Sequence, residues 1–350
     1  MMKKGIELGI YTLGDLGMDP HTGSTISMHQ RLKEIIEMGK LADEAGFDIF
    51  GVGEHHRLDY AVSSPAVVLS AVAQVTKQIK LTSATSVLST LDPVRLFEDF
   101  STVDLLSNGR AEIIAGRGAF VESFPLFGYD LDEYDALFEE NIKLLQQLNE
   151  EEIVSWQGQF RPSLTNAMIS PRPVQKKLPL WVGVGGTPES AVRAGRLGTG
   201  MAMAILGGDP KRFKPLVDLY FQAGSEAGYS RDSLSVGVTG HTYITKESQQ
   251  ARDEFYPYYS NYWSYVNKQR GMETRVSRAD FEIMASAETA LFVGSPEEII
   301  EKILYQHELF GHKRFIAQLD IGGQSFSNIV KGMELLATKV APIVRRETSK

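Results

Sequence analysis

"AGFDIFGVGEHH", residues 45–56, joins the end of a helix to a strand and stops on three polar residues. The apolar face of that helix is formed by Leu32, Ile35, Ile36, Gly39 and Ala42, which recur at helical spacing. Gly46 follows the helix, where glycine adopts a left-handed cap at little cost. The apolar run after Gly46 predicts a buried strand that presents Glu54, His55 and His56 where it ends.

The same order of helix, glycine and apolar run recurs along the chain. Gly109, Gly198 and Gly311 each stand just before an apolar run, as Gly46 does. Counting the strand-like apolar runs of the whole chain gives eight predicted strands, at residues 5–13, 47–54, 80–88, 111–117, 179–185, 200–206, 234–244 and 314–321. Runs this apolar are typical of parallel strands covered on both faces, so eight β/α units predict a closed (β/α)8 barrel, the TIM barrel.

The chain is longer than such a barrel needs. A (β/α)8 barrel takes roughly 250 residues, whereas this chain has 350. We expect residues 1–350 to form a single domain, with insertions at the rim at about 119–133, 151–178 and 246–290. The second insertion reads as a hairpin around Gly158. The third is rich in aromatic residues, and it is expected to cover the barrel mouth or to form a dimer face.

Composition excludes several classes of protein. The formal net charge of −8 argues against nucleic acid as the main partner. The sequence contains no cysteine, which excludes disulfides, thiolate nucleophiles and cysteine-ligated zinc. No apolar stretch is long enough for a membrane span, and the N-terminus lacks a cleavage site, so a cytoplasmic protein is expected.

The stretch "WVGVGGTPES", residues 181–190, predicts an anion site. Thr187 fits a helix N-cap and Pro188 the first helical position, so backbone N–H groups of the first turn face the glycines. Arg117, at the end of the preceding predicted barrel strand, would suit a single phosphate. The turn fits an ordinary capped helix equally well, and Arg117 taken alone fits a rim salt bridge.

Other polar residues stand at predicted strand ends, where β/α barrels carry their working groups. Tyr11, His241, Gln318 and Asp320 are therefore candidates for contact with a substrate. Adjacent histidines on a strand point to opposite faces, so His55 and His56 do not predict a shared metal, and no metal ligand is expected. Glu54 and Asp320 leave open a carboxylate-based hydrolase, for which their separation would be decisive.

These pieces together resemble the bacterial luciferase-like flavin monooxygenase family along nearly the whole chain. The resemblance is carried by "AGFDIFGVGEHH", by "SATSVLSTLDPVRLFEDFSTVDLLSNGRAEIIAGRG", by "FEENIKLL" and by "LPLWVGVGGTPESAVRAGRLG". It implies a β/α barrel that binds FMN or a deazaflavin, with reduced FMN (FMNH2) supplied by a separate reductase. It also implies a homodimer and a cis peptide near Ala84–Thr85.

The resemblance assigns roles to individual residues. His55 and Arg117 match the catalytic histidine and the flavin-contacting arginine. The implied cofactor-binding positions are Glu54, Ala84, Thr85, Ser86, Arg117, Gly185, Gly186, Thr187 and Ser190. Gly116 departs from the pattern, because luciferase has a reactive cysteine at this position, and the resemblance therefore does not extend to light emission.

The expected function is an FMN-dependent monooxygenase that inserts one oxygen atom from O2 into a small organic substrate. Two alternatives share the fold: a deazaflavin-dependent oxidoreductase that transfers hydride, and a flavin-binding protein without catalysis. A barrel hydrolase would bind no flavin at all. The sequence carries no pattern that identifies the substrate, because rim loops determine it.

Overall fold

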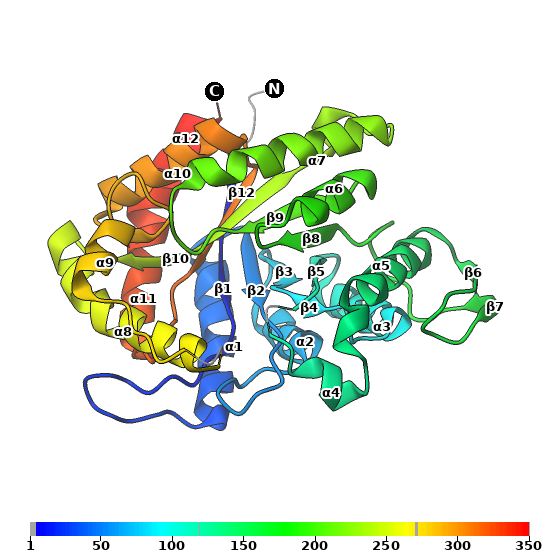
Figure 1. The fold of residues 1–350 in the computed structure, drawn as a ribbon, viewed down its shortest axis with the longest axis horizontal. Helices are drawn as coiled ribbons and strands as arrows, with labels where there is room; N and C mark the ends of the chain where they lie inside the picture. Colours follow the sequence, from blue (N-terminus) through cyan, green and yellow to red (C-terminus); the bar gives the residue numbers. More distant parts are fainter. Residues whose placement is uncertain (1–4, 119, 270–271, 350) are drawn as a thin grey trace.

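The computed structural model describes residues 5–118, 120–269 and 272–349 (Figure 1). The strands of its main sheet are β1 (Glu7–Thr12), β2 (Ile49–Val52), β3 (Lys80–Ser83), β4 (Ser86–Val87), β5 (Ala111–Gly116), β8 (Leu180–Val184), β9 (Gly200–Ala204), β10 (Val236–Ile244), β11 (Phe292–Gly294) and β12 (Arg314–Gln318). The helices that follow these strands are α1 (Met28–Glu44), α2 (Pro65–Val75), α3 (Pro93–Ser107), α5 (Tyr134–Glu150), α6 (Pro188–Arg196), α7 (Lys214–Glu226), α10 (Pro296–Phe310), α11 (Phe326–Leu335) and α12 (Ala341–Thr348).

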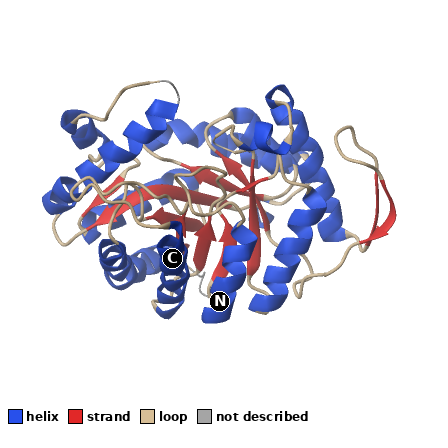
Figure 2. Ribbon diagram, turned by 90° about the horizontal axis from the view of Figure 1, so that it is seen from below, coloured by secondary structure: helices blue, strands red, loops and turns tan. Residues whose placement is uncertain are grey.

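Parallel pairing closes the sheet into a barrel. Around it the strands follow the order β1, β2, β3, β5, β8, β9, β10 and β12, and β12 pairs again with β1. Figure 2 shows the strands enclosed by helices. The predicted (β/α)8 barrel is confirmed, and each predicted strand segment contains a barrel strand. Short β11, which was not predicted, pairs with β10 outside the closed ring.

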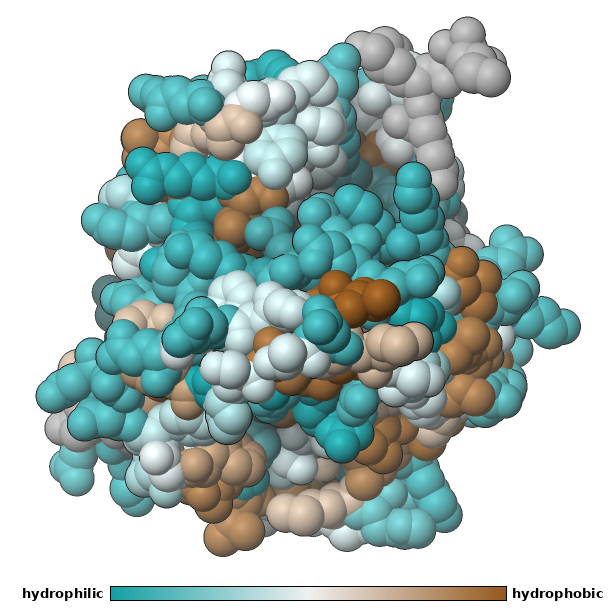
Figure 3. All heavy atoms as spheres, turned by 90° about the vertical axis from the view of Figure 1, so that its right-hand side faces the viewer, coloured by the Kyte–Doolittle hydropathy of each residue, from teal (hydrophilic) through white to brown (hydrophobic). Residues whose placement is uncertain are grey.

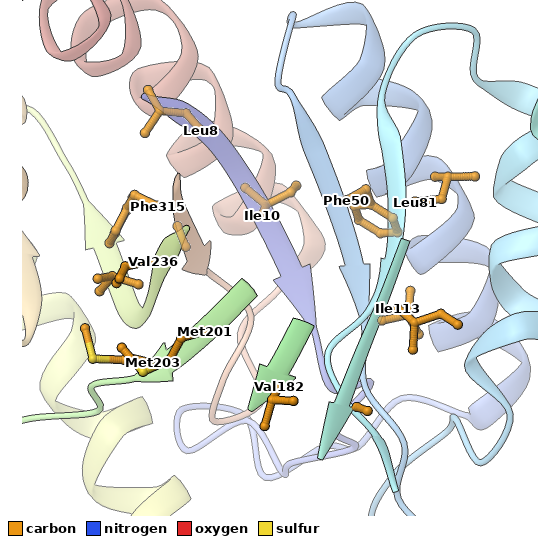
Figure 4. Close-up of a cluster of buried hydrophobic side chains, with 14 of the residues drawn as sticks. Leu8, Ile10, Phe50, Leu81, Ile113, Val182, Met201, Met203, Val236 and Phe315 are labelled. Carbon is orange, nitrogen blue, oxygen red and sulfur yellow. The ribbon is translucent and has the colours of Figure 1, made fainter. Parts of the chain in front are cut away.

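Strand alternation sorts the side chains of the barrel between two environments. Residues such as Leu8, Ile10, Phe50 and Phe315 lie between the barrel and its helices, where they form the main apolar core (Figure 4). The alternate residues point into the barrel. At its amino-terminal end Arg314 bonds Glu7 and Glu112 and covers the ring of Trp181, which fills this end.

Interior residues are smaller toward the carboxyl-terminal end of the barrel. Ala84, Gly116, Gly183, Ala202 and Ala204 border a cavity there. Side chains this small leave space that the residues at the other end occupy, and they place the opening at the end where β/α barrels bind ligands.

The three predicted insertion regions hold further elements. Residues 119–133 include α4 (Ser123–Phe127), and 151–178 include β6 (Ile153–Trp156) and β7 (Leu164–Met168), an antiparallel hairpin that projects from the barrel (Figures 1 and 2). Residues 246–290 include α8 (Ser248–Gln269) and α9 (Arg278–Met284). Residues 119, 270 and 271 of these regions lie outside the described residues. Within the described ranges no helix is both long and apolar enough to cross a membrane.

Candidate active site

The cavity at the carboxyl ends of the strands has a volume of about 320 Å³. Among the predicted site residues, it is lined by Tyr11, Glu54, His55, Ala84, Thr85, Arg117, Gly185, His241 and Gln318. The structure thus brings together residues at the carboxyl ends of seven of the eight barrel strands. Ser86, Gly186, Thr187 and Ser190 lie next to this lining, whereas Asp320 lies elsewhere.

Arg117 connects the end of β5 to the start of α6. Its Nη2 donates to Thr187 Oγ1 at 3.1 Å and to Ser190 Oγ at 2.9 Å, while its Nη1 pairs with Asp135. The guanidinium also lies over the Tyr134 ring, 4.9 Å from its centroid. Both readings of Arg117 therefore hold in part, since it makes a rim salt bridge and also reaches the predicted anion site.

The turn before α6 fits a phosphate. Thr187 is the N-cap of α6, yet its side chain makes no capping hydrogen bond. A Cβ built on Gly185 or Gly186 would meet no atom within 4 Å, so the turn faces open space, and Gly186 has a φ of 132° that favours glycine. A helix N-terminus with open approach, two hydroxyls and an arginine suits an anion of one or two negative charges.

His55 stands at the cavity edge in a largely apolar setting. It is 8% exposed, stacks on Tyr60 with ring centroids 4.0 Å apart, and contacts Phe120 edge-on. Its Nδ1 lies 3.7 Å from Glu122 Oε1. Partial burial raises the pKa of Glu122, but its contacts with His55 and its own backbone N–H outweigh this and hold the pKa below the usual range. Glu122 is thus an anion that can fix the tautomer of His55.

Glu54 holds its neighbours in place. Its Oε2 accepts from the backbone N–H of Val87 at 2.9 Å, and its Oε1 bonds His56 Nε2 at 2.8 Å. This leaves His55 as the histidine of the pair that is free of Glu54. The peptide between Ala84 and Thr85 is cis, as the resemblance implied, and both residues line the cavity beside Glu54.

Gly116 leaves no room for the cysteine of luciferase. A Cβ at this position would lie 2.5 Å from Thr85 Oγ1, closer than real Cβ contacts come. The absence of a reactive thiol beside Arg117 is therefore matched by the way Thr85 packs against this glycine.

Three polar residues form the far wall of the cavity. The Tyr11 hydroxyl hydrogen-bonds the side chain of Thr239. His241 and Gln318 are each 1% exposed, and His241 Nδ1 and both amide atoms of Gln318 have no hydrogen-bond partner among the described residues. Burial lowers the pKa of His241 to about 4, so its imidazole is neutral at pH 7.

Asp320 does not join this wall. Strand β12 ends at Gln318, and the Asp320 carboxylate pairs with Arg31 of α1 and accepts from Thr12. The carboxylate is 0% exposed and faces a cation on the helix side of the barrel. It is therefore separated from Glu54, which has its own partners at the end of β2, and the two do not form a pair of catalytic carboxylates.

Sequence reasoning missed several residues of the site. Tyr262, Trp263 and Val266 of α8 line the cavity. The aromatic content of residues 246–290 predicts that this insertion covers the barrel mouth or forms a dimer face, but not which of its side chains reach the cavity. Asp135, Glu122 and Tyr60 are brought in by tertiary packing. No spacing in the sequence links them to Arg117 or His55.

Comparison with known proteins gives a consistent result. Residues 6–313 match the model of the luciferase-like monooxygenase family. The oxygenase component of the flavin-dependent trigonelline monooxygenase of Acinetobacter baylyi is 22% identical over 89% of this chain and 90% of its own. The alkanal monooxygenase alpha chain of Photorhabdus laumondii subsp. laumondii is 23% identical over 92% and 94%.

A solved structure agrees with this match. The crystal structure of a monooxygenase from Streptomyces bottropensis superposes with a TM-score of 0.82 at 25% identity, covering 97% of this chain and 99% of the other. Its similarity extends over the barrel and the insertions together. The chain therefore belongs to the luciferase-like monooxygenase family.

Proposed function

We propose that this chain is an FMN-dependent monooxygenase, which uses FMNH2 from a separate reductase and inserts one atom of O2 into a small organic substrate. The second oxygen atom leaves as water, and the flavin leaves oxidised. The observation that carries the proposal is the continuity of two sites: the anion site at Arg117, Thr187 and Ser190 opens beside the apolar cavity at His55. A phosphate with an attached planar ring system fits such a pair of sites.

One group of residues would bind the flavin phosphate, and another would keep water away from the flavin ring. Arg117 and the start of α6 would hold the phosphate, and Gly185 and Gly186 would let it approach the backbone. Reduced FMN, when bound, supplies the two electrons with which O2 is activated. Tyr262 and Trp263 of α8 line the cavity, where they would exclude water from the reacting centre.

His55 is proposed as the catalytic acid–base group. Its Nδ1 faces Glu122, which favours a proton on that nitrogen and leaves Nε2 to accept or donate a proton at the cavity. Stacking on Tyr60 fixes the ring plane, so the proton is transferred at a defined place.

Two measurements test the proposal. Flavin fluorescence titration should give tighter binding of FMN than of riboflavin, and Arg117→Met should weaken FMN binding at least tenfold while leaving riboflavin binding unchanged. A deazaflavin titrated in parallel reports cofactor choice. Clear preference for the deazaflavin would favour hydride transfer instead.

The second measurement separates catalysis from passive binding. Anaerobic protein with bound FMNH2 is mixed with oxygenated buffer, and flavin oxidation is followed by absorbance. We expect oxidation slower than that of free FMNH2, and a changed rate in His55→Ala. Oxidation at the free rate in both proteins would leave a flavin-binding protein without catalysis as the better account.

The assembly is proposed on separate grounds. Val67 and Val75 of α2 and Leu105 and Leu106 of α3 are exposed apolar residues on neighbouring helices, which supports a homodimer through this face. Pairing of β1 with β12 ties the two ends of the chain together, which supports one domain over residues 1–350.

A further inference from the structure

The strand order places the two halves of the cavity opposite each other. In the closed ring, β12 is four strands from β5, and β10 is four strands from β3. In an eight-strand barrel, four strands is half of the circumference. Gln318 on β12 therefore stands across the barrel from Arg117, and His241 on β10 stands across from Ala84 and Thr85.

The wall with Gln318 and His241 has hydrogen-bonding capacity that the protein does not use. Both Gln318 amide atoms and His241 Nδ1 are buried without a partner among the described residues, although both side chains line the cavity. Buried polar atoms are nearly always paired, because an unpaired one loses its hydrogen bonds to water without gaining any in the protein. Since both side chains border the cavity, a ligand bound there is the nearest group that could pair with them.

Charge in the cavity is confined to the other side. In the described part of the chain, the lining residues with an ionisable acid or base follow β2 or β5, namely Glu54, His55, His56, Arg117 and Glu122; the one further histidine of the lining, His241, is kept neutral at pH 7 because burial lowers its pKa to about 4. Glu54 contacts His56, His55 faces Glu122, and Arg117 pairs with Asp135. The wall at Gln318 therefore offers a charged group no counter-ion, and burial of an unpaired charge is costly.

Aromatic rings enclose this wall. His241 meets the ring of Tyr262 edge-on at a centroid distance of 5.5 Å and lies 6.3 Å from that of Trp263. Both rings belong to α8, which also supplies Val266 to the lining. The space in front of Gln318 is thus apolar on its sides and polar at its end.

From these observations we propose that Gln318 and His241 bind the substrate, and that the substrate is an uncharged molecule with an apolar body and one hydroxyl or carbonyl oxygen. The Gln318 amide can donate to this oxygen or accept from it, and the neutral imidazole of His241 supplies the complementary group. This inference rests on the proposed function, because it assigns the anion site across the barrel to the flavin.

The test uses three probes of similar size on the FMN-saturated protein, with isothermal titration calorimetry. The probes are p-cresol, which has a ring and a hydroxyl, toluene, which lacks the hydroxyl, and benzoate, which carries a charge. We expect p-cresol to bind at least tenfold tighter than toluene, which corresponds to about 1.4 kcal/mol. Benzoate should not bind at the highest p-cresol concentration used.

Gln318→Leu keeps the volume and removes the amide. This variant should bind p-cresol at least tenfold more weakly than the unaltered protein does, and it should bind toluene equally tightly or more tightly. Gln306→Leu is the matched control. Gln306 is also 1% exposed and its amide has no partner within the described ranges, but it lies on α10 outside the cavity lining. This control should retain the preference for p-cresol.

Several outcomes would overturn the inference. Equal binding of p-cresol and toluene by the unaltered protein would do so without any variant. So would benzoate binding as tight as that of p-cresol, or an unchanged preference in Gln318→Leu. A tenfold loss of FMN affinity in Gln318→Leu would reassign the amide to the cofactor. Failure of the unaltered protein to bind FMN would instead count against the proposed function.

Discussion

At the scale of single residues, Gly116 shows how one missing side chain shapes the site. Arg117 follows Gly116 directly. A Cβ built on Gly116 would lie 2.5 Å from Thr85 Oγ1 and 3.0 Å from Thr85 Cβ, so Thr85 occupies the space that a side chain would need. The glycine therefore lets the end of β5 approach the segment between β3 and β4. That approach brings Arg117 and Thr85 into the same cavity lining.

Gly116→Ala is expected to destabilise the protein. Overpacking of this kind costs about 1–3 kcal/mol, because Thr85 must move. Thr85→Ala in the same chain removes Oγ1 and Cγ2 and should recover part of the loss, which a double-mutant cycle in urea measures. Gly332→Ala serves as the control, since the nearest atom to its Cβ would be 3.6 Å away. If the losses in free energy of unfolding of the two single variants simply add in the double variant, residue 116 and Thr85 are not in contact.

At the scale of elements, a single carboxylate joins α1 to the segment that leads into β3. The oxygens of Asp43, near the end of α1, accept from the backbone N–H groups of Lys77, Gln78 and Ile79 at 2.8, 2.9 and 2.7 Å. Partial burial raises the pKa of Asp43, but these three donors outweigh it and hold the pKa below its usual range. The carboxylate thereby fixes how α1 and β3 meet.

Asp43→Ala should lower the free energy of unfolding by about 1–3 kcal/mol at neutral pH, because three donors lose a charged acceptor. The folded protein binds the Asp43 proton more weakly than the unfolded chain, so the contribution is present above the usual aspartate pKa and is lost as the pH falls below it. Urea unfolding at pH 7 and pH 3 checks this. A difference between the two proteins that persists undiminished at pH 3 would contradict it.

The elements also show what the sequence could predict. Four of the eight barrel strands follow a glycine such as Gly46 or Gly311, whose φ values are 77° and 61°, and the other strands were located by their apolar runs alone. β11 was missed because it has only three residues and no glycine stands just before it. Arg117 was placed at the anion site because a strand end and a helix start are both local signals.

Other parts of the site depend on packing that no local pattern encodes. Asp320 follows a strand that ends two residues earlier, so its side chain was free to turn toward Arg31 rather than into the barrel. Asp135 and Tyr60 reach Arg117 and His55 from segments whose positions are set by the whole fold. The sequence could therefore predict which strand ends carry polar groups, but not which of them face the cavity.

At the scale of the whole molecule, the two ends of the barrel have different tasks. The amino-terminal end is filled by Trp181 and by Arg314 with its carboxylate partners, all largely buried. At the carboxyl-terminal end small residues leave a cavity, and α8 completes the lining of that cavity with Tyr262, Trp263 and Val266. The barrel is therefore filled by side chains at one end, and the cavity lies at the other.

The outer surface carries a further feature of the whole molecule. Figure 3 shows apolar patches among hydrophilic residues on the side that is at the right in Figure 1. On α2 and α3, Val67 is 69% exposed and Leu106 is 48% exposed. A group of exposed apolar residues on two neighbouring helices is typical of a surface that contacts another protein.

We expect sedimentation velocity to give a particle near twice the chain mass of 38.8 kDa. Val67→Glu with Leu106→Glu should shift the protein to a monomer, because carboxylates of the same charge would be buried without partners at a symmetric interface. Ile283→Glu is the control: Ile283 is 68% exposed on α9, which lies on the other side of the barrel from α2 and α3 (Figure 1). A monomer at every concentration of the unaltered protein would contradict the homodimer. Dissociation caused by Ile283→Glu alone would contradict an interface formed by α2 and α3. Retention of FMN binding by the monomer would further show that each chain carries a complete site, as the cavity built from one chain predicts.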